Sequence, residues 1–488
     1  MKEYKSTLDI ASNSNFREVQ AKKSVFFLGA SIIVAAIQFG NKFAFYVPFT
    51  VISILMTLIW KKTPRPWIFL VSIAAATPIA VSRQKFACNV VFAIWFALLN
   101  MRYLFKLPKW IYVPTFLCLL GFLVSSISWL PENPVGGLLR EGAYAVNFIL
   151  APFILVPLIY FRMEKSRDFE ANLKGLLFCL IIPSTLILLS AKLLGTVSND
   201  FEASRNHLGG TEGFLMYRLG RVDINFLRTE VGFILSALIC ASSAIAMSQV
   251  KTRYKLVARA CLVANIFLLF ATGSVGSALS CLCGIGTMLY VQFRKISAKN
   301  VIVSVVGIGC LLLLTYTISP PSIKNYIGKR FEDRVTNKND DRIWLWVNAL
   351  HYYIDNPSGV GFTLAVDYAL GGRKKAVIHN DYLAYTVSYS LLGGVAYTSL
   401  ILGLIISFFK LGKYVSNDPY ALAVYLAGLS VIVAAAINSM TDHMTENRWY
   451  FNLIWSVIWY SYFCSRAAAI KPIPDGLNAK PVFPNRMP

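Results

Sequence analysis

Histidine is the side chain that most readily moves a proton near neutral pH, and this chain of 488 residues holds only four of them: His207, His351, His379 and His443. His379 has the most informative position, because it ends a polar stretch and stands directly before a long apolar run. A histidine there would be held by a helix end at the membrane surface and could take the proton of an attacking hydroxyl group. The alternative interpretation is structural, with Asn380 as the cap of the helix and His379 as its polar neighbour.

Arginine is the second residue type that could do chemistry here. Its planar guanidinium binds phosphate oxygens in pairs and stays charged in a dry site. The candidates lie in two polar segments, 196–228 and 319–380, and they are Arg218, Arg221, Arg228 and Arg342. Each could instead attract lipid headgroups or pair with acids such as Asp223, Glu332 and Asp333. Taken together with His379, the set predicts a site that binds a diphosphate and stabilises the charge on it as it departs.

The elements that must position these residues are membrane helices. Hydrophobic residues make up 56% of the chain and charged residues 15%, against roughly 25% charged in soluble proteins. Helices that cross a membrane need about 20 apolar residues, and fourteen such stretches are predicted. They are 24–40, 43–60, 67–82, 86–101, 111–130, 147–161, 175–195, 229–248, 256–271, 275–293, 301–318, 381–409, 420–438 and 449–464. The predicted fold is an all-α polytopic integral membrane protein with 12 to 14 spans, which argues against a soluble enzyme.

The net charge of +23 is interpreted as a signal of membrane orientation. With the N-terminus inside, the inward segments hold more than half of the 47 basic residues and only a third of the 24 acidic ones, as the positive-inside rule requires. Segment 1–23 and the tail 465–488, which is predicted to be disordered, are then cytoplasmic. The unit 24–464 carries both long loops, 196–228 and 319–380, on the opposite side. Nucleic acid is not an expected partner, whereas the lipid bilayer is.

The second long loop contains a helix signal of its own. Asn339 or Asp340 can cap a helix that carries acids in its first turn. Apolar residues then recur at helical spacing from 343 to 354, and Asn356 with Pro357 ends the pattern. We expect an amphipathic helix that lies along the membrane surface or folds over the bundle.

Metal-dependent transfer and ion-coupled transport are both disfavoured. Glycosyltransferases that hold a divalent ion with acids in their first outer loop would need carboxylates near 41–42, where Asn41 and Lys42 stand. No metal or other cofactor is therefore predicted, and arginine would have to bind the diphosphate. Transporters usually carry paired ionisable residues near mid-bilayer, whereas Lys192, Glu230 and Asp381 all lie near span ends.

The second half of the chain resembles the O-antigen ligase and polymerase superfamily. The resemblance rests on a series of motifs in order, best over 330–405 and weaker upstream from 220. They are Gly220-Arg221-x-x-x-Asn225-x-x-x-x-Glu230-x-Gly232, Thr272-Gly273-Ser274-x-Gly276, Arg342-x-Trp344, Asn356-Pro357-x-Gly359-x-Gly361, His379-Asn380-x-Tyr382-Leu383 and Leu392-Gly393-Gly394. The family often has arginine where this chain has Val275, so that arginine's role is not carried over.

The resemblance implies a bundle of the lipid-carrier glycosyltransferase type in a bacterial inner membrane, with a periplasmic active site. It implies metal-independent, inverting transfer of a glycan from undecaprenyl diphosphate to an acceptor hydroxyl. His379 would be the base, and Arg221 and Arg342 would bind diphosphate. Arg218 and Arg228 are candidates from position alone, and Asn380 and Tyr382 would support the site.

Several functions stay open within and beyond that class. A polymerase would extend a lipid-linked repeat, a ligase would transfer the chain to lipid A-core, and a relative could glycosylate protein. A flippase or exporter of the same lipid-linked glycan is the alternative from another class, and a non-catalytic member of a polysaccharide assembly complex is a third. His379→Ala separates them, because it should abolish only a catalysed transfer.

Overall fold

The computed structural model gives the arrangement of the helices around the predicted site. It describes residues 94, 97–131, 141–142, 144–194, 215–219, 222–226, 228–272, 274–293, 341–362, 378, 380–441 and 448–470. The predicted spans 24–40, 43–60, 67–82 and 301–318 lie outside the described residues, as does most of 86–101. The tail beyond residue 470 also lies outside them.

The described part of the chain is a helical bundle, as predicted. Its regular helices are α5 (Tyr112–Trp129), α7 (Val156–Tyr160), α8 (Phe169–Leu176), α9 (Ile182–Leu194), α11 (Arg228–Met247), α12 (Thr252–Thr272), α13 (Val275–Phe293), α16 (Asp341–Asp355), α18 (Asp381–Val415), α19 (Pro419–Thr441) and α20 (Arg448–Ala469). Five helical segments among the described residues are long and apolar enough to cross a membrane: 109–129, 169–186, 275–292, 381–415 and 419–441. The membrane-protein fold class is thus supported, although α20 continues five residues beyond the predicted end of its span at 464.

One element in the described residues departs from the all-α prediction. Strands β1 (Leu215–Leu219) and β2 (Val222–Phe226) pair antiparallel, with Leu215 opposite Phe226 and Leu219 opposite Val222. This hairpin lies in segment 196–228, which the sequence predicted only as a loop. Apolar and polar residues alternate in β2, from Val222 to Phe226, but not in β1, so the sequence signal for a hairpin was short and present in one strand.

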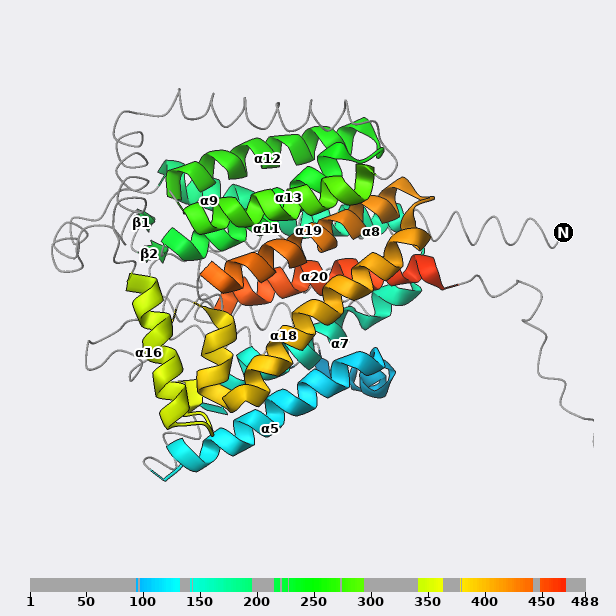
Figure 1. Cartoon of the computed structure of the whole chain (residues 1–488). Helices are drawn as coiled ribbons and strands as arrows, with labels where there is room; N and C mark the ends of the chain where they lie inside the picture. The colour runs from blue at the N-terminus through cyan, green and yellow to red at the C-terminus, as the bar shows by residue number, and fades with distance from the viewer. Residues whose placement is uncertain are drawn as a thin grey trace, which may run out of the picture.

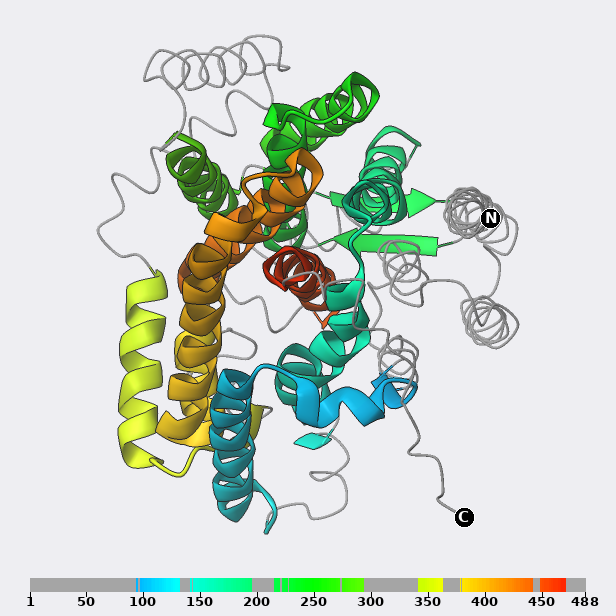
Figure 2. The same ribbon diagram turned by 90° about the vertical axis from the view of Figure 1, so that its right-hand side faces the viewer.

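The helices pack in two groups that share α19. On one side α11 contacts α12, α13 and α19, and on the other α18 lies between α5 and α19. Helix α20 runs through the middle against α19 and α18, and its Trp455, Trp459 and Tyr460 are fully buried (Figures 1 and 2). Large apolar side chains on the outward faces of α5, α12, α13 and α18 stay exposed, as expected of surfaces that face lipid.

The two ends of the bundle differ, and we name them by their residues. At the motif end, on the left of Figure 1, α11, α13, α18 and α20 begin, and the hairpin and α16 lie beside them. At the basic end, on the right, lie the 3₁₀-helix η3 (Met101–Lys106), the 3₁₀-helix η6 (Phe161–Lys165) and the connection from α11 to α12. Each long helix runs from one of these ends to the other.

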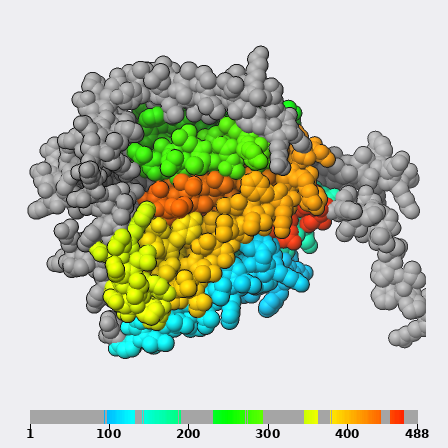
Figure 3. Space-filling model, viewed as in Figure 1, coloured from blue at the N-terminus to red at the C-terminus, as the bar shows by residue number. Residues whose placement is uncertain are grey.

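Helix α16 confirms the predicted amphipathic helix and its end at Asn356. One face packs on the first part of α18 through a cluster of Ala349, Val360, Ile378, Ala384 and Val387. The opposite face exposes Val347, Leu350 and Ile354. Of the two predicted placements, the structure therefore shows the helix packed on the bundle, where it lies beside the left-hand part of α18 in Figure 3.

The predicted span 147–161 is helical but irregular, because it contains Pro152. The π-helix η5 (Val146–Leu155) contains Pro152, which has no N–H to give to the carbonyl of Phe148, four residues earlier. The Tyr385 hydroxyl of α18 donates to that carbonyl instead, at 2.6 Å. The Trp459 indole donates to the Pro152 carbonyl at 2.9 Å. Both bonds tie this irregular helix to its neighbours.

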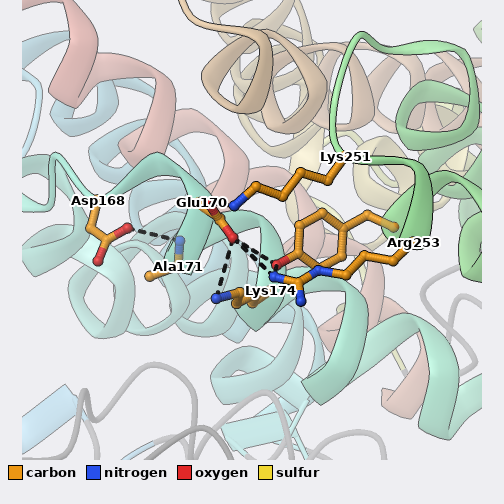
Figure 4. A network of polar contacts seen from close by, with 7 residues as sticks. Asp168, Glu170, Ala171, Lys174, Lys251 and Arg253 are labelled. Carbon is orange, nitrogen blue, oxygen red and sulfur yellow. Dashed lines mark hydrogen bonds and ion pairs between the residues drawn. The ribbon is translucent and has the colours of Figure 1, made fainter. Parts of the chain in front are cut away.

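The basic end is joined by charges. Glu170 of α8 lies 2.8 Å from the Lys251 ammonium, 3.4 Å from that of Lys174 and 3.5 Å from the guanidinium of Arg253 (Figure 4). It also accepts a hydrogen bond from the Tyr254 hydroxyl at 2.8 Å. A single carboxylate thus connects the start of α8 to the start of α12.

Candidate functional site

The predicted site centres on the beginning of α18. The Asn380 side chain accepts a hydrogen bond from the Leu383 amide at 3.1 Å, and its own amide group donates to the Met440 carbonyl at 3.5 Å. Asn380 is therefore the N-cap of α18, which satisfies an amide that would otherwise lack a partner. His379 itself lies outside the described residues. Because Asn380 provides the cap, His379 is not needed for that role.

The first turn of α18 is anchored from within the bundle. The Tyr382 hydroxyl donates to the Ala436 carbonyl of α19 at 3.2 Å. Its ring meets Tyr397 with 5.4 Å between centroids, and Tyr397 in turn stacks on Tyr385 at 4.3 Å. Asp381 is fully buried in the same turn, where a negative charge is favoured by the helix N-terminus. Tyr382 and Asn380 thus hold the start of the helix, while their supporting role at the site stays a prediction.

Helix α18 is not continuous, although the sequence predicted one unbroken span. Tyr389 and Ser390 leave the helical conformation, and Ser390 has φ 62° and ψ −179°, a region almost restricted to glycine. The segment after α16 packs against this break, with the Val360 amide donating to the Val387 carbonyl at 3.1 Å. The break therefore lies where the chain that follows α16 reaches α18.

The Asn-Pro-x-Gly-x-Gly motif explains how the two segments come so close. Gly359 has φ +82°, and a Cβ there would lie 2.6 Å from the Ser390 nitrogen and 2.8 Å from the Ser388 oxygen. Only glycine fits such a conformation beside another backbone. The motif is thus joined to the break, and Leu392-Gly393-Gly394 follows directly. Two motifs that are separate in the sequence meet at one place.

Glu141 is a residue of this region that the sequence did not single out. Its carboxylate is buried and accepts a hydrogen bond from the Phe362 amide at 2.8 Å. A Cβ on Gly361 would lie 3.0 Å from this carboxyl group and 2.7 Å from the Trp129 ring. Glu141 therefore holds the end of the motif by this hydrogen bond, and Trp129 of α5 lies beside it. No local pattern around Glu141 signals this contact, which depends on the tertiary fold.

The weaker upstream motifs also meet in space. Gly232 of α11 faces Ser274 and Ser277, and a Cβ at Gly232 would overlap their side chains. Gly276 approaches Thr441 at the end of α19 in the same way. Below them, Asn438 donates to the Ser236 hydroxyl at 2.9 Å and accepts from the Ser280 hydroxyl at 2.6 Å. These contacts bring the starts of α11 and α13 together with the end of α19.

The predicted diphosphate-binding arginines belong to elements at the motif end. Arg218 is in β1, opposite Asp223 in the register; Arg228 is the first residue of α11, and Arg342 is the second residue of α16. The structure describes their backbone and not the direction of their side chains, and Arg221 lies outside the described residues. Their binding role stays a prediction.

Comparison with known protein families tests the predicted resemblance. A family model described as O-Antigen ligase matches residues 260–398. The match runs from α12 into α18 and contains all the motifs above except Gly220 to Gly232. No curated protein matches the chain. Residues 260–398 are thus similar to an O-antigen ligase domain, which confirms the predicted resemblance to the O-antigen ligase and polymerase superfamily.

Proposed function

We propose that this protein transfers a glycan from undecaprenyl diphosphate to an acceptor hydroxyl group at the motif end of the bundle. The observation that carries the proposal is the meeting of the family's motifs there. The Asn-Pro-x-Gly-x-Gly segment lies on the break in α18, and Asn380 caps the start of the same helix. The described residues that flank His379 in sequence are thus anchored, Ile378 in the cluster with α16 and Asn380 in the cap.

The proposed reaction is a single displacement at the sugar carbon that bears the diphosphate. The acceptor oxygen forms a bond to this carbon while the bond from carbon to the phosphate oxygen breaks, and the configuration inverts. The acceptor's proton passes to His379, which acts as a general base. The electron pair of the broken bond leaves with the diphosphate, whose negative charge arginines stabilise.

Two further features of the motif end support binding of an anion. Helices α11, α13 and α18 all begin there, and the N-terminus of a helix carries a partial positive charge that attracts anions. Arg228 and Arg342 lie in the first turns of α11 and α16. We assign Arg221 and Arg342 to the diphosphate, with Arg218 and Arg228 as further candidates.

The proposed orientation follows from charge. Basic residues at the basic end include Arg102, Arg162, Lys251 and Arg253, and positive charge stays on the cytoplasmic side. The motif end would then face the periplasm of a bacterial inner membrane, with both termini in the cytoplasm. The acceptor would be a lipid-linked repeat for a polymerase, or lipid A-core for a ligase.

The test is a gel of surface and lipid-linked glycans from cells that lack the protein, complemented with wild type or His379→Ala. We expect loss of transfer with His379→Ala, seen as single repeats on the carrier for a polymerase or long chains stranded on it for a ligase. His351→Ala is the matched control, because His351 is an exposed histidine on α16. Normal glycans with His379→Ala at equal protein level would instead favour an exporter or a non-catalytic role.

A further inference from the structure

Two groups of positive side chains surround tyrosine rings at the basic end. In the first group, the Arg253 guanidinium lies 4.8 Å from the centre of the Tyr254 ring. In the second, three cations approach the single ring of Tyr103: Arg102 at 4.9 Å, Arg162 at 5.4 Å and Lys106 at 5.9 Å. A tyrosine ring attracts a cation only weakly at an exposed site, so neither ring neutralises its group.

The first group has its own counter-charge. Glu170 pairs with Lys251, Lys174 and Arg253 and accepts from the Tyr254 hydroxyl (Figure 4). Three cations thus share one carboxylate. In this group the protein itself provides the anion, the Glu170 carboxylate, that compensates the positive charges.

The second group lacks that compensation within the described part of the chain. None of the ion pairs found there involves Arg102, Lys106 or Arg162. The Nε atom of Arg162 is buried and has no hydrogen-bond partner, which is costly for a charged group. Burial raises the pKa of the Tyr103 hydroxyl, but the positive charges of Arg162 and Arg102, together with their hydrogen bonds to this hydroxyl, outweigh it and bring the pKa below its ordinary value.

The group is assembled by packing and not by loose side chains. The Tyr103 ring contacts Phe161 at 5.3 Å between centroids, which places η3 beside Arg162 of η6. Helix η3 also contacts α7. Figure 2 views this end of the bundle and shows η3, in blue, next to the start of α5.

The surface beside the group is apolar. Phe105 of η3 is 90% exposed, and Val113 and Phe116 on the adjoining α5 are 63% and 64% exposed. Side chains of this kind next to lysine and arginine are typical of the boundary between lipid chains and headgroups. A ligand with both an anionic head and an apolar tail fits this surface better than a free anion does.

We propose that Arg102, Lys106, Arg162 and Tyr103 form a binding site for the phosphate headgroup of an anionic phospholipid in the leaflet at the basic end. The headgroup would supply the counter-charge that Glu170 supplies to the first group. Its acyl chains would lie along the exposed face of α5. This site is separate from the proposed transfer site and does not depend on it.

Native mass spectrometry of the full-length protein in detergent tests the proposal, with phosphatidylglycerol and phosphatidylcholine added in turn. Wild type should retain phosphatidylglycerol in preference. Each basic residue near a membrane surface contributes about a fivefold affinity for anionic lipid. The combined variant Arg102→Gln with Arg162→Gln should therefore lose roughly thirtyfold, and Lys106→Gln about fivefold.

Arg253→Gln is the matched control, since Arg253 also lies over a tyrosine ring but is paired with Glu170. It should leave lipid binding unchanged. Arg102→Lys with Arg162→Lys keeps the charge and should retain most of the binding, which guards against a variant that only misfolds. Equal lipid retention by the glutamine variants, or an equal loss with Arg253→Gln, would overturn the proposal. Displacement by millimolar inorganic phosphate would show a free-phosphate site instead of a lipid site.

Discussion

At the basic end of the bundle, Glu170 gathers three positive side chains and a tyrosine hydroxyl into one joint between α8 and α12. At the motif end, the joints between helices use close backbone approach at Gly359 and the uncharged amide of Asn438. A joint made of long charged side chains adapts to movement and is screened by salt. A joint made of backbone contact is rigid and insensitive to salt.

The difference suits the functions we propose for the two ends. A transfer site needs its groups held to within a fraction of an ångström, and the glycine contacts and the cap at Asn380 provide such support.

Of the substitutions that test this comparison, Gly359→Ala should have the largest effect on stability. A Cβ at this position would meet the Ser390 nitrogen and the Ser388 oxygen, and φ at +82° strains any other residue. We expect a loss of about 2–4 kcal/mol in the free energy of unfolding, together with loss of glycan transfer. Unfolding in detergent, followed by circular dichroism, measures the first quantity.

The control for that substitution is Gly286→Ala on α13, where a Cβ would have open space around it. It should be neutral or stabilise by up to about 1 kcal/mol. If the Gly359→Ala protein were as stable as the Gly286→Ala protein, the backbone contact at Gly359 would not be rigid, and the proposed difference between the two ends would be wrong.

Glu170→Gln tests the opposite end and should have an intermediate effect. The amide keeps the shape but loses the charge that binds Lys251 and Arg253, and Glu170 is partly exposed. We expect a loss of about 1–2 kcal/mol, smaller at high salt because salt already screens the pairs in the wild type. Chemical unfolding at two salt concentrations measures it, and glycan transfer should persist.

Lys174→Gln removes one cation of the same group, an i,i+4 pair with Glu170, and should cost only about 0.3–0.5 kcal/mol. If Glu170→Gln showed no salt dependence, the description of the basic end as an electrostatic joint would be wrong.

The sequence predicts most of the described helices, because a run of apolar residues long enough to cross a bilayer has few other structures open to it. It also predicts α16 and its end at Asn356, since the helix start, the apolar spacing and the stop agree. The irregular turn of η5 follows from Pro152 once the missing N–H is considered.

The break in α18 could not be predicted from the sequence, because it depends on tertiary contacts. Residues 388–390 read Ser-Tyr-Ser, which neither requires nor forbids a helix. The break is accommodated by Gly359 and by Gly121 of α5, where a Cβ would overlap the Tyr389 carbonyl. Glu141 was missed for the same reason. At the site, the cap by Asn380 is confirmed, while the roles of His379 and the four arginines stay predictions.

Substitutions of Asn380 should change stability only modestly, and they sharpen the comparison most. Asn380→Ala removes the acceptor for the Leu383 amide and should cost about 1 kcal/mol. Asn380→Asp keeps the acceptor and adds a negative charge that the helix N-terminus tolerates, but it loses the hydrogen bond that Asn380 donates to the Met440 carbonyl. Its stability should therefore lie between those of Asn380→Ala and wild type. The added charge would stand beside the proposed diphosphate site, however, and repel the donor. We therefore expect Asn380→Asp to be stable yet poor in glycan transfer, and Asn380→Ala to be less stable yet more active per folded molecule. The reverse order of activities would show that the motif end does not bind an anion next to α18, because a cap alone would make the aspartate variant the better enzyme.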